Sequence, residues 1–402
     1  MSHDSERRSE ARVVQGGRPR RLQTVTFETT LRCDQGCLFC GSRAGKQSST
    51  ELSTEEIRSL FQQAAKMGVK DFELTGGETY LRDDWVELIR MATELGMTCA
   101  LITAGRAIDD TKARQARQAG LDRVSVSLDG LRETHESLRR TPNGFDLGLR
   151  AIAAFRNAGL DVGCNTQVNA RNWRDLPPLA DLLVTQGLYA WQIQLMIPMG
   201  RAADAADLWL EPYQMLEVIP AIARVIDRCA PDHLKVFAGD NVGYFGPHEG
   251  ALRRYSSRRG HTIGCSAGLM VVGVDANGNV TGCSALDGAE QMAGNIRERE
   301  LCTIFEEAAV LRRNVKDGEV WGFCATCYYA AVCRGGCSAT AIALTGRPGN
   351  NPYCHHRALE LARIGKRERL SVAGPHLDGP RGHGNFEIVV EEQAAEADAC
   401  ES

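Results

Sequence analysis

Three cysteines stand close together near the start of the chain, at Cys33, Cys37 and Cys40, separated by three and by two residues. They follow a run rich in threonine and valine, residues 23–30, which is typical of a strand. A loop this tight can bring all three thiols to one metal centre, and sulfur ligands favour zinc or iron–sulfur clusters over hard cations. With only three thiolates, a four-iron cluster would keep one iron without a protein ligand.

A structural zinc site is the alternative for this loop, since zinc also takes cysteine ligands. Such a site is closed by a fourth ligand, but no further Cys or His lies near the loop in this part of the sequence. Cys99 and Cys164 fall inside predicted strands, where a thiol is expected to be buried like a small apolar side chain. The open position is therefore the main chemical feature of the N-terminal half.

A repeating pattern of elements must position this loop. Apolar runs alternate with amphipathic stretches, which is the signature of strand–helix units. The predicted strands are residues 23–30, 71–77, 98–104, 123–129, 161–168 and 191–198, and the predicted helices are residues 53–67, 83–95, 109–119, 143–158 and 175–186. Ser53 and Glu56 form a capping box at the start of the first helix. Six such units in series predict an α/β fold, a partial (β/α)6 barrel of the TIM type.

Chemistry in such barrels is carried by residues at the carboxyl ends of the strands. Cys33 follows the first predicted strand, and glycine or polar residues stand at the ends of later ones. They are Gly76, Gly77 and Glu78 at the end of the second strand, Ser127 and Asp129 at the end of the fourth, Asn165 and Gln167 on the fifth, and residues 198–201 at the end of the sixth. We therefore expect these groups to share one mouth of the barrel.

The cysteine loop, with Phe39 directly before its third cysteine and a Gly-Gly-Glu segment on the next strand, resembles the radical S-adenosylmethionine (SAM) superfamily. The resemblance implies that Cys33, Cys37 and Cys40 hold a 4Fe-4S cluster whose open iron binds SAM. It further implies that one electron cleaves SAM to methionine and a 5'-deoxyadenosyl radical, which removes hydrogen from an unactivated C–H bond.

The same resemblance implies contacts to SAM. Phe39 is expected to pack near the adenine, while Gly76 and Gly77 allow close backbone approach. The strand that carries them supports the SAM ammonium in the family, so Glu78 either contacts the ammonium or shapes the turn.

Two further contacts are implied at the end of the fourth strand and beyond it. Ser127 and Asp129 resemble polar residues near the ribose, and Arg139 is expected near the SAM carboxylate. Surface solvation is the alternative for Ser127 and Arg139. Residues 198–202 match a stretch near the adenine, in which Arg201 is not expected to be catalytic.

A second group of cysteines lies in the C-terminal part. Residues 269–283 alternate apolar and polar side chains around Asn277-Gly278, which predicts a β-hairpin. The cysteines of this part with regular spacing are Cys265, Cys283, Cys324, Cys327, Cys333, Cys337 and Cys354. This seven-cysteine pattern resembles the SPASM domain, with zinc ribbons as the alternative.

The SPASM resemblance implies two auxiliary iron–sulfur clusters of the 4Fe-4S type. Their implied ligands are Cys324, Cys327, Cys333 and Cys354 for one cluster, and Cys265, Cys283 and Cys337 for the other. Some relatives add a cysteine about six residues before the first, where this chain has Arg259. The second cluster is thus left with an open iron, a two-iron core, or a remote ligand such as Cys229 or Cys302.

The chain has 402 residues and divides, on this interpretation, into five parts. They are a mobile basic arm (1–22), the barrel (23–204), a connector with a helix near 211–228 (205–260), the SPASM domain with a β-hairpin and helices (261–369), and an acidic tail (370–402). The tail is rich in Gly, Pro and acids, so we expect it to be mostly disordered, with residues 386–390 as a short added strand.

The composition of the chain narrows the classes of molecule that it is expected to bind. The net charge of -4 favours neither nucleic acid nor an anionic membrane. No apolar run approaches the length of a membrane span, and the charged start is unlike a signal peptide. Fifteen cysteines, an odd number, fit metal ligands in a reducing cytoplasm better than disulfides.

Most SPASM proteins act on peptides or proteins, so the resemblance implies a maturase that oxidatively modifies, by cross-linking or dehydrogenation, a side chain of a ribosomally synthesised precursor peptide. The auxiliary clusters would accept the substrate electron. An electron donor such as flavodoxin or ferredoxin is implied, and a separate leader-recognition protein is one option. Three alternatives are a peptide epimerase, a small-molecule dehydrogenase and a noncatalytic iron–sulfur or zinc protein. An epimerase needs a thiol hydrogen donor, for which Cys99 and Cys164 are the candidates.

An anaerobic sulfatase-maturase-like enzyme is a further alternative. Such enzymes place an acidic base directly after the second cysteine of the hairpin, where this chain has Ser284. Ser284 is therefore the one candidate for a catalytic side chain at this position.

Overall fold

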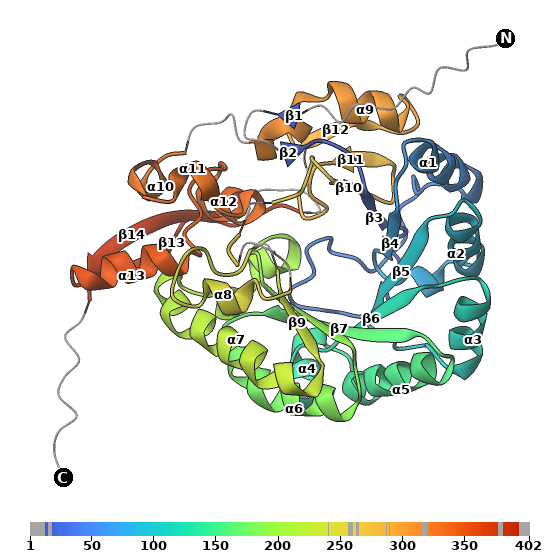
Figure 1. Ribbon diagram of the computed structural model, residues 1–402, viewed down its shortest axis with the longest axis horizontal. Coiled ribbons are helices and arrows are strands. Elements are labelled where there is room, and N and C mark those ends of the chain that lie inside the picture. The colour runs from blue at the N-terminus through green and yellow to red at the C-terminus, as the bar shows by residue number, and fades with distance from the viewer. Residues whose placement is uncertain are drawn as a thin grey trace.

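A ten-stranded sheet forms the frame of the molecule, with helices along its outer side (Figure 1). The structure is a computed structural model that describes residues 13–14, 18–239, 241–255, 260–262, 265–286, 288, 290–315, 320–376 and 381–393. The strand order is β12-β11-β10-β3-β4-β5-β6-β7-β8-β9, parallel from β10 to β9 and antiparallel from β10 to β12. The strands are β3 (Thr24–Glu28), β4 (Asp71–Thr75), β5 (Thr98–Thr103), β6 (Arg123–Ser127), β7 (Asp161–Val168), β8 (Ala190–Leu195), β9 (Lys235–Ala238), β10 (Val271–Val274), β11 (Asn279–Thr281) and β12 (Met292–Asn295).

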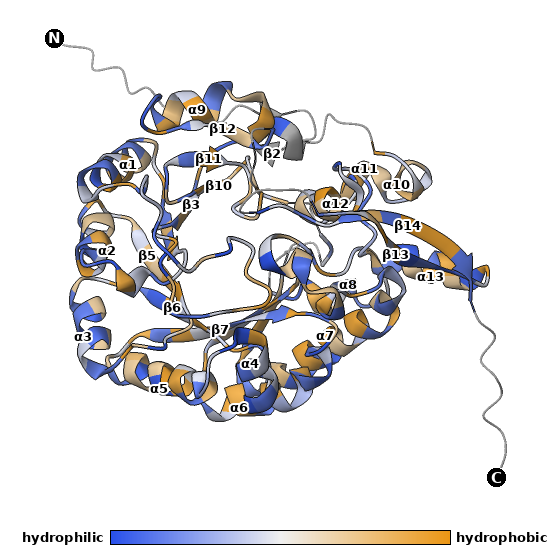
Figure 2. Ribbon diagram, turned by 180° about the vertical axis from the view of Figure 1, so that it is seen from behind, coloured by the Kyte–Doolittle hydropathy of each residue, from blue (hydrophilic) through white to orange (hydrophobic). Residues whose placement is uncertain are grey.

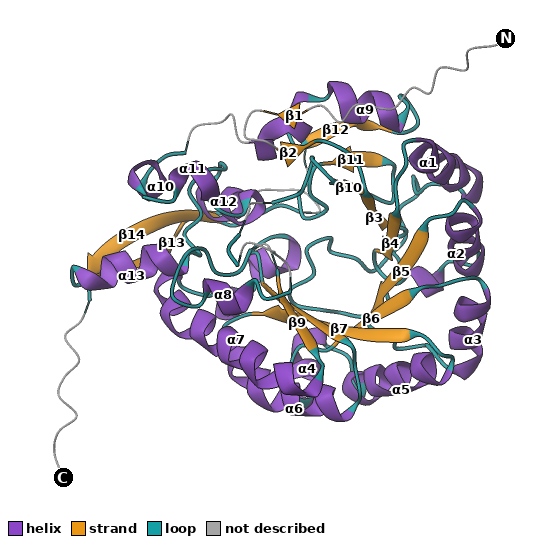
Figure 3. Ribbon diagram, in the orientation of Figure 1, coloured by secondary structure: helices purple, strands orange, loops and turns teal. Residues whose placement is uncertain are grey.

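Helices cover the outer face of the sheet and build the C-terminal part, while loops gather inside the ring of strands (Figure 3). Those of the barrel are α1 (Thr54–Lys66), α2 (Trp85–Glu94), α3 (Asp110–Gln118), α4 (Arg132–Arg139), α5 (Gly144–Asn157), α6 (Leu176–Thr185) and α7 (Met215–Cys229). Those that follow are α8 (Glu249–Leu252), α9 (Leu301–Glu307), α10 (Phe323–Thr326), α11 (Ala330–Cys333), α12 (Ser338–Thr345) and α13 (His355–Arg363).

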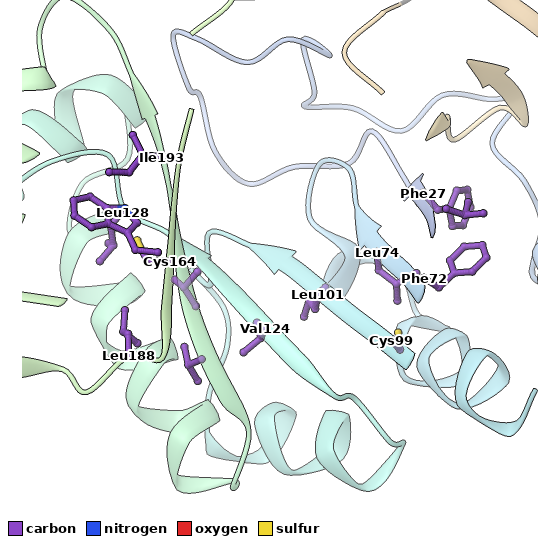
Figure 4. Packing of buried hydrophobic residues seen from close by; sticks show 14 of the residues in the cluster. Phe27, Phe72, Leu74, Cys99, Leu101, Val124, Leu128, Cys164, Leu188 and Ile193 are labelled. Carbon is purple, nitrogen blue, oxygen red and sulfur yellow. The ribbon is translucent and has the colours of Figure 1, made fainter. Parts of the chain in front are cut away.

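Each central strand turns its apolar side chains outward, against the helices. Phe27 of β3 meets Phe61 of α1 edge to face, with ring centroids 6.4 Å apart. Thr26 and Glu28 lie on the opposite, inner face of the same strand, because side chains alternate along a strand. Figure 4 shows Phe27 and Leu101 among the outward side chains, and Figure 2 shows hydrophobic and hydrophilic residues alternating along α2, α5 and α6.

The sequence predicted this barrel closely. All six predicted strands and all five predicted helices are present, and the capping box of Ser53 and Glu56 closes the first turn of α1. The hairpin at Asn277-Gly278 is also confirmed as β10 and β11. One helix of the barrel, α4, was not predicted.

The sheet does not stop at the predicted boundary of residue 204. β9, which lies in the predicted connector, pairs in parallel with β8, and β10 pairs in parallel with β3. The hairpin of the C-terminal part therefore extends the barrel sheet. This joins the two parts into one continuous sheet, because a strand that finds a neighbour satisfies its backbone hydrogen bonds there.

Both predicted terminal tails need correction within the described residues. Near the N-terminus β1 (Val13–Val14) pairs with β2 (Arg18–Pro19), and the guanidinium of Arg20 lies 4.1 Å from the ring centroid of Phe305. Near the C-terminus β13 (Lys366–Gly374) and β14 (Asn385–Glu392) form a hairpin, so these segments are ordered by backbone pairing. The predicted strand at 386–390 is confirmed as part of β14, whereas residues 1–12, 15–17, 377–380 and 394–402 lie outside the described residues.

In the described part of the chain, no helix has both the length and the apolar character required to cross a membrane.

Candidate functional site

The cysteine loop is clamped to the end of β4 by its backbone. The N–H of Gly77 donates to the carbonyl of Thr30 over 2.7 Å, and the N–H of Glu78 donates to the carbonyl of Arg32 over 2.7 Å. A Cβ atom on Gly77 would lie 2.0 Å from the Arg32 oxygen, so only glycine permits this approach. The sequence predicted that this glycine pair allows close backbone approach to SAM. In the structure, the backbone that lies close to Gly77 is that of the cysteine loop.

A second clamp comes from Arg201, in the segment after β8. Its Nε donates to the carbonyl of Cys37 over 2.7 Å and its guanidinium donates to the carbonyl of Ala44 over 2.9 Å. Its backbone N–H donates to the carbonyl of Cys40 over 3.0 Å. Arg201 therefore holds the loop at three points, a positioning role consistent with the prediction that it is not catalytic. Its side-chain bonds were not predicted.

The thiols of the loop are half-buried or buried, which for Cys33 and Cys37 opposes ionisation. Burial, followed by the negative charge of Glu78, raises the pKa of the Cys33 thiol to about 12, and Cys37 and Cys40 add to the effect. Burial also raises the pKa of Cys37 to about 11, although Arg139 opposes it. Such thiols are protonated at neutral pH, so a metal centre bound by them releases protons and binds more tightly as the pH rises.

Two carboxylates stand next to Cys33. Its sulfur and one oxygen each of Asp34 and Glu78 all lie within 4.8 Å of one another. Glu78 is 3% exposed and accepts hydrogen bonds from Thr103 and from the N–H of Ala104, the latter over 2.7 Å. Burial nevertheless raises the pKa of Glu78 to about 7. A thiol and two carboxyl groups gathered at one place, of which Glu78 is buried and the other two are half-buried, make it a site for positive charge.

Asp34 adds to this character. One of its oxygens accepts from the hydroxyl of Tyr80 over 2.9 Å, while its other oxygen, Oδ1, is buried without a hydrogen-bond partner among the described residues. Buried carboxylate oxygens are nearly always bonded. The geometry thus leaves an acceptor beside Cys33 for a donor that the chain itself does not supply.

Asp129 and Arg139, which were predicted as separate contacts to SAM, are both buried and form an ion pair with each other. Nε of Arg139 donates to Asp129 over 2.7 Å, and the second Asp129 oxygen accepts from the N–H of Gln167 over 2.9 Å. Burial lowers the pKa of a guanidinium, but Asp129 and Cys37 outweigh it, so the pKa of Arg139 is raised. The guanidinium lies 5.6 Å from the ring centroid of Phe39. The pair therefore keeps a positive charge next to Cys37 and Phe39.

The remaining polar residues of the barrel lie on its inner side. Ser127 pairs with Asn165 across β6 and β7, and both are half-buried. Side-chain oxygens of Asn165 and Gln167 are buried without a hydrogen-bond partner among the described residues. These oxygens are therefore available to a polar ligand inside the barrel.

Cys99 and Cys164 belong instead to the apolar core of the barrel. They are 0% and 1% exposed, respectively, and Figure 4 shows both among the buried hydrophobic side chains. The expectation that they are buried apolar thiols is confirmed.

Four C-terminal cysteines line one cavity. They are Cys324, Cys327, Cys333 and Cys354. Burial raises the pKa of Cys354, and the charges of Cys333 and Cys324 contribute to the rise. The aromatic rings of Phe245 and Tyr329, which also line the cavity, stack 4.3 Å apart. The SPASM resemblance implied this set of four as ligands of one cluster, and four thiols around one cavity can hold such a group.

The other implied ligand set is gathered in part. Cys337 lies in a small apolar cluster with Tyr244, and Cys283 packs against this cluster. Ser284, the candidate catalytic residue, is exposed directly after Cys283.

The proposed remote ligands lie elsewhere. Cys229 is the last residue of α7 and lies in the apolar core, and Cys302 is exposed on α9. Neither packs in the described cluster around Cys337. The position of Arg259 lies outside the described residues.

Known proteins resemble this chain along most of its length. Residues 27–183 match the family model of the radical SAM superfamily. The AdoMet-dependent heme synthase of Methanosarcina barkeri is 29% identical over 358 residues, which are 83% of this chain and 96% of that protein. Mycofactocin maturase MftC of Mycolicibacterium smegmatis is 29% identical over 365 residues, which are 89% of this chain and 88% of that protein.

The fold has solved counterparts. Streptococcus suis SuiB bound to S-adenosylmethionine superposes with a TM-score of 0.66 at 16% sequence identity, over 84% of this chain and 76% of SuiB. At this identity the likeness establishes the fold alone.

Proposed function

We propose that this chain, which is a radical SAM enzyme with a SPASM-type C-terminal domain, oxidatively modifies a side chain of a ribosomally synthesised precursor peptide. The observation that carries the oxidative part is the cavity lined by four cysteines. A second redox centre in the same molecule can take the electron that remains on a substrate after hydrogen removal. A reaction without net oxidation has no use for it.

The first site fits a 4Fe-4S cluster with SAM. Cys33, Cys37 and Cys40 are the ligands in this proposal, and bound SAM supplies a radical that removes hydrogen from an unactivated C–H bond. The carboxyl oxygens of Asp34 and Glu78, which lie within 4.8 Å of each other and of the Cys33 sulfur, are suitable acceptors for the SAM ammonium. Arg139, whose guanidinium is ion-paired with Asp129, supplies positive charge near Cys37. These charges orient SAM without taking part in the chemistry.

In the C-terminal part the proposal keeps two auxiliary clusters. Cys324, Cys327, Cys333 and Cys354 hold one, supported by the cavity that they share. Cys265, Cys283 and Cys337 hold the other, supported by the packing of Cys283 near Cys337. An external donor such as flavodoxin or ferredoxin supplies the first electron, and a separate protein is an option for leader recognition.

A peptide substrate is supported by the similarity to a mycofactocin maturase over most of both chains. Epimerisation is disfavoured, because both thiols considered as hydrogen donors, Cys99 and Cys164, lie in the core. A sulfatase-maturase-like reaction is disfavoured by Ser284 at the position of an acidic base.

The test is anaerobic reconstitution with SAM, dithionite and a candidate precursor peptide. The expected result is deoxyadenosine together with a peptide that has lost hydrogen, located by fragment masses. Deoxyadenosine without any change in peptide mass, across a panel of candidate peptides, would contradict the peptide substrate.

A second candidate substrate is an iron-bound tetrapyrrole. It is favoured by the 29% identity with an AdoMet-dependent heme synthase. The same incubation with an iron porphyrin in place of the peptide distinguishes the two, since only the modified substrate changes mass.

A further inference from the structure

A short segment of the C-terminal part, residues 381–384, pairs with the loop that follows β8. The N–H of Gly200 donates to the carbonyl of Gly382 over 2.8 Å, and the N–H of Gly384 donates to the carbonyl of Pro198 over 3.1 Å. Met199 and His383 form an antiparallel bridge between these two bonds. The segment therefore lies in extended form along residues 198–200, as an added strand would.

Arg381 anchors this segment by its side chain. Its guanidinium donates to the carboxylate of Glu28 over 2.7 Å, to the hydroxyl of Ser42 over 3.2 Å and to the carbonyl of Ser284. The side chains of Arg381 and Glu28 are each only 9% exposed. Such a buried, charge-assisted contact fixes where the segment lies and requires a cationic side chain at this position.

The guanidinium of Arg381 lies between two segments that carry cysteines. Ser42 follows Cys40, and Ser284 follows Cys283. The paired loop is packed on the first of these, since a Cβ on Gly200 would lie 2.2 Å from the carbonyl of Gly41. An extended chain bound here passes next to the proposed site of SAM cleavage.

The buried carboxylate of Glu28 is stabilised by a positively charged partner. It ends β3, and its side chain is on the inner face of the strand, with Thr26. Among the described residues Arg381 is its only ion-pair partner. A buried carboxylate without a partner is costly, so departure of Arg381 leaves a site that selects another cation.

We propose that Glu28 and the backbone of residues 198–200 bind an extended peptide segment that carries an arginine or a lysine, and that residues 381–384 occupy this site as an intramolecular stand-in. The proposal rests on the proposed function, because it assigns the substrate peptide a basic residue next to the modified position. Main-chain pairing supplies affinity, and the carboxylate of Glu28 supplies specificity.

The test is calorimetric binding of the peptide Gly-Pro-Arg-Gly-His-Gly-Asn-Phe, the sequence of residues 379–386, to the anaerobically prepared full-length holoprotein. In the wild-type chain the tethered segment competes at an effective concentration on the order of millimolar. The Arg381→Ala substitution weakens this competition, so the variant chain is expected to bind the peptide at least tenfold more tightly than the wild-type chain does.

Three controls test which groups cause the tighter binding. Arg381→Ala combined with Glu28→Gln is expected to lose the gain, as is a peptide with alanine in place of its arginine. Arg367→Ala removes a different Arg–Glu pair, with Glu391 in the same hairpin, and is expected to bind like wild type. Equal affinity of the wild-type and Arg381→Ala chains, or no preference for the arginine peptide, would overturn the proposal.

A second measurement needs no variant. In the wild-type holoprotein, excess peptide is expected to speed hydrogen exchange at the amide of Gly384, as the tethered segment is displaced. An unchanged exchange rate at saturating peptide would also overturn the proposal.

The two proposals fail separately, because binding is measured without SAM. Peptides that bind but are never modified contradict the proposed function alone. A peptide that is modified equally well without its basic residue contradicts this inference alone.

Discussion

At the scale of single residues, the cysteine loop is held by groups that bind its carbonyl oxygens. Gly77 and Glu78 bind it through their N–H groups, and Arg201 binds it through its guanidinium. These bonds fix the direction in which the three thiols point. A loop with no regular structure is thus as well defined as the strands around it.

Arg201 is expected to control the occupancy of the first site. Hydrogen bonds from a charged group contribute about 1.5–3 kcal/mol each, so Arg201→Met should lower SAM cleavage at least about tenfold. Iron bound per chain should fall with it. Arg43→Ala, which removes an exposed pair with Asp204, serves as the control and should leave both unchanged. Normal iron content in Arg201→Met would show that the clamp is dispensable.

Gly77→Ala tests the close contact between β4 and the loop. The added Cβ would meet the backbone oxygen of Arg32 at 2.0 Å, so the loop must move. Overpacking of this kind costs about 1–3 kcal/mol or more, and we expect at least a tenfold loss of SAM cleavage. Gly45→Ala is the matched control in the same loop, because a Cβ there has no neighbour within 4 Å. Comparable activity of the two variants would contradict the steric argument.

His135 is expected to make stability depend on pH. Burial, followed by Arg139, lowers its pKa from 6.5 to about 3, and its Nδ1 accepts from the N–H of Asp129 over 3.1 Å. Below pH 6.5 the unfolded chain binds a proton that the folded chain does not, so stability falls as the pH decreases. At pH 5.5 the loss is between about 1 and 2 kcal/mol.

His135→Asn keeps an acceptor at this place without the titration. Thermal unfolding of both holoproteins at pH 8 and pH 5.5 measures the difference. The melting temperature of wild type should fall further between these values than that of the variant. Parallel decreases would rule out a contribution from His135.

At the scale of elements, the barrel could be predicted because its strands and helices repeat a local pattern. α4 escaped prediction because its sequence, Arg-Glu-Thr-His-Glu-Ser-Leu-Arg, offers one apolar residue, Leu138, and otherwise buries the polar His135 and Arg139. β13 escaped because Lys366 to Arg369 carry charge at every position. Such elements are fixed by tertiary partners, which no local pattern reveals.

The parallel pairing of β10 with β3 makes the C-terminal hairpin part of the barrel. A chain that ends after Thr262 would leave the edge of β3 unpaired, and exposed edges associate. We expect this fragment to aggregate or oligomerise on size-exclusion chromatography with light scattering. A chain that ends at Val315 keeps β10, β11 and β12 and should remain monomeric. A monomeric, folded shorter fragment would show that the two parts are independent.

At the scale of the whole molecule, one of the cysteine groups predicted from spacing comes together around a cavity, lined by Cys324, Cys327, Cys333 and Cys354. Cysteine spacing is a local property, so this grouping could be predicted from the sequence. The partners of Glu28 could not, because Arg381 lies 353 residues away. Contacts over that distance depend on how the C-terminal part packs against the open sheet, where β10 lies next to β3.

The most direct test of the account is the iron and sulfide content per chain of wild type and of a variant with Cys33, Cys37 and Cys40 all changed to alanine. The account predicts that the variant retains the iron of the C-terminal sites and loses about four iron atoms with their sulfide. It also predicts that SAM cleavage is abolished. Unchanged iron in the variant, or zinc in place of iron in the wild-type chain, would contradict it.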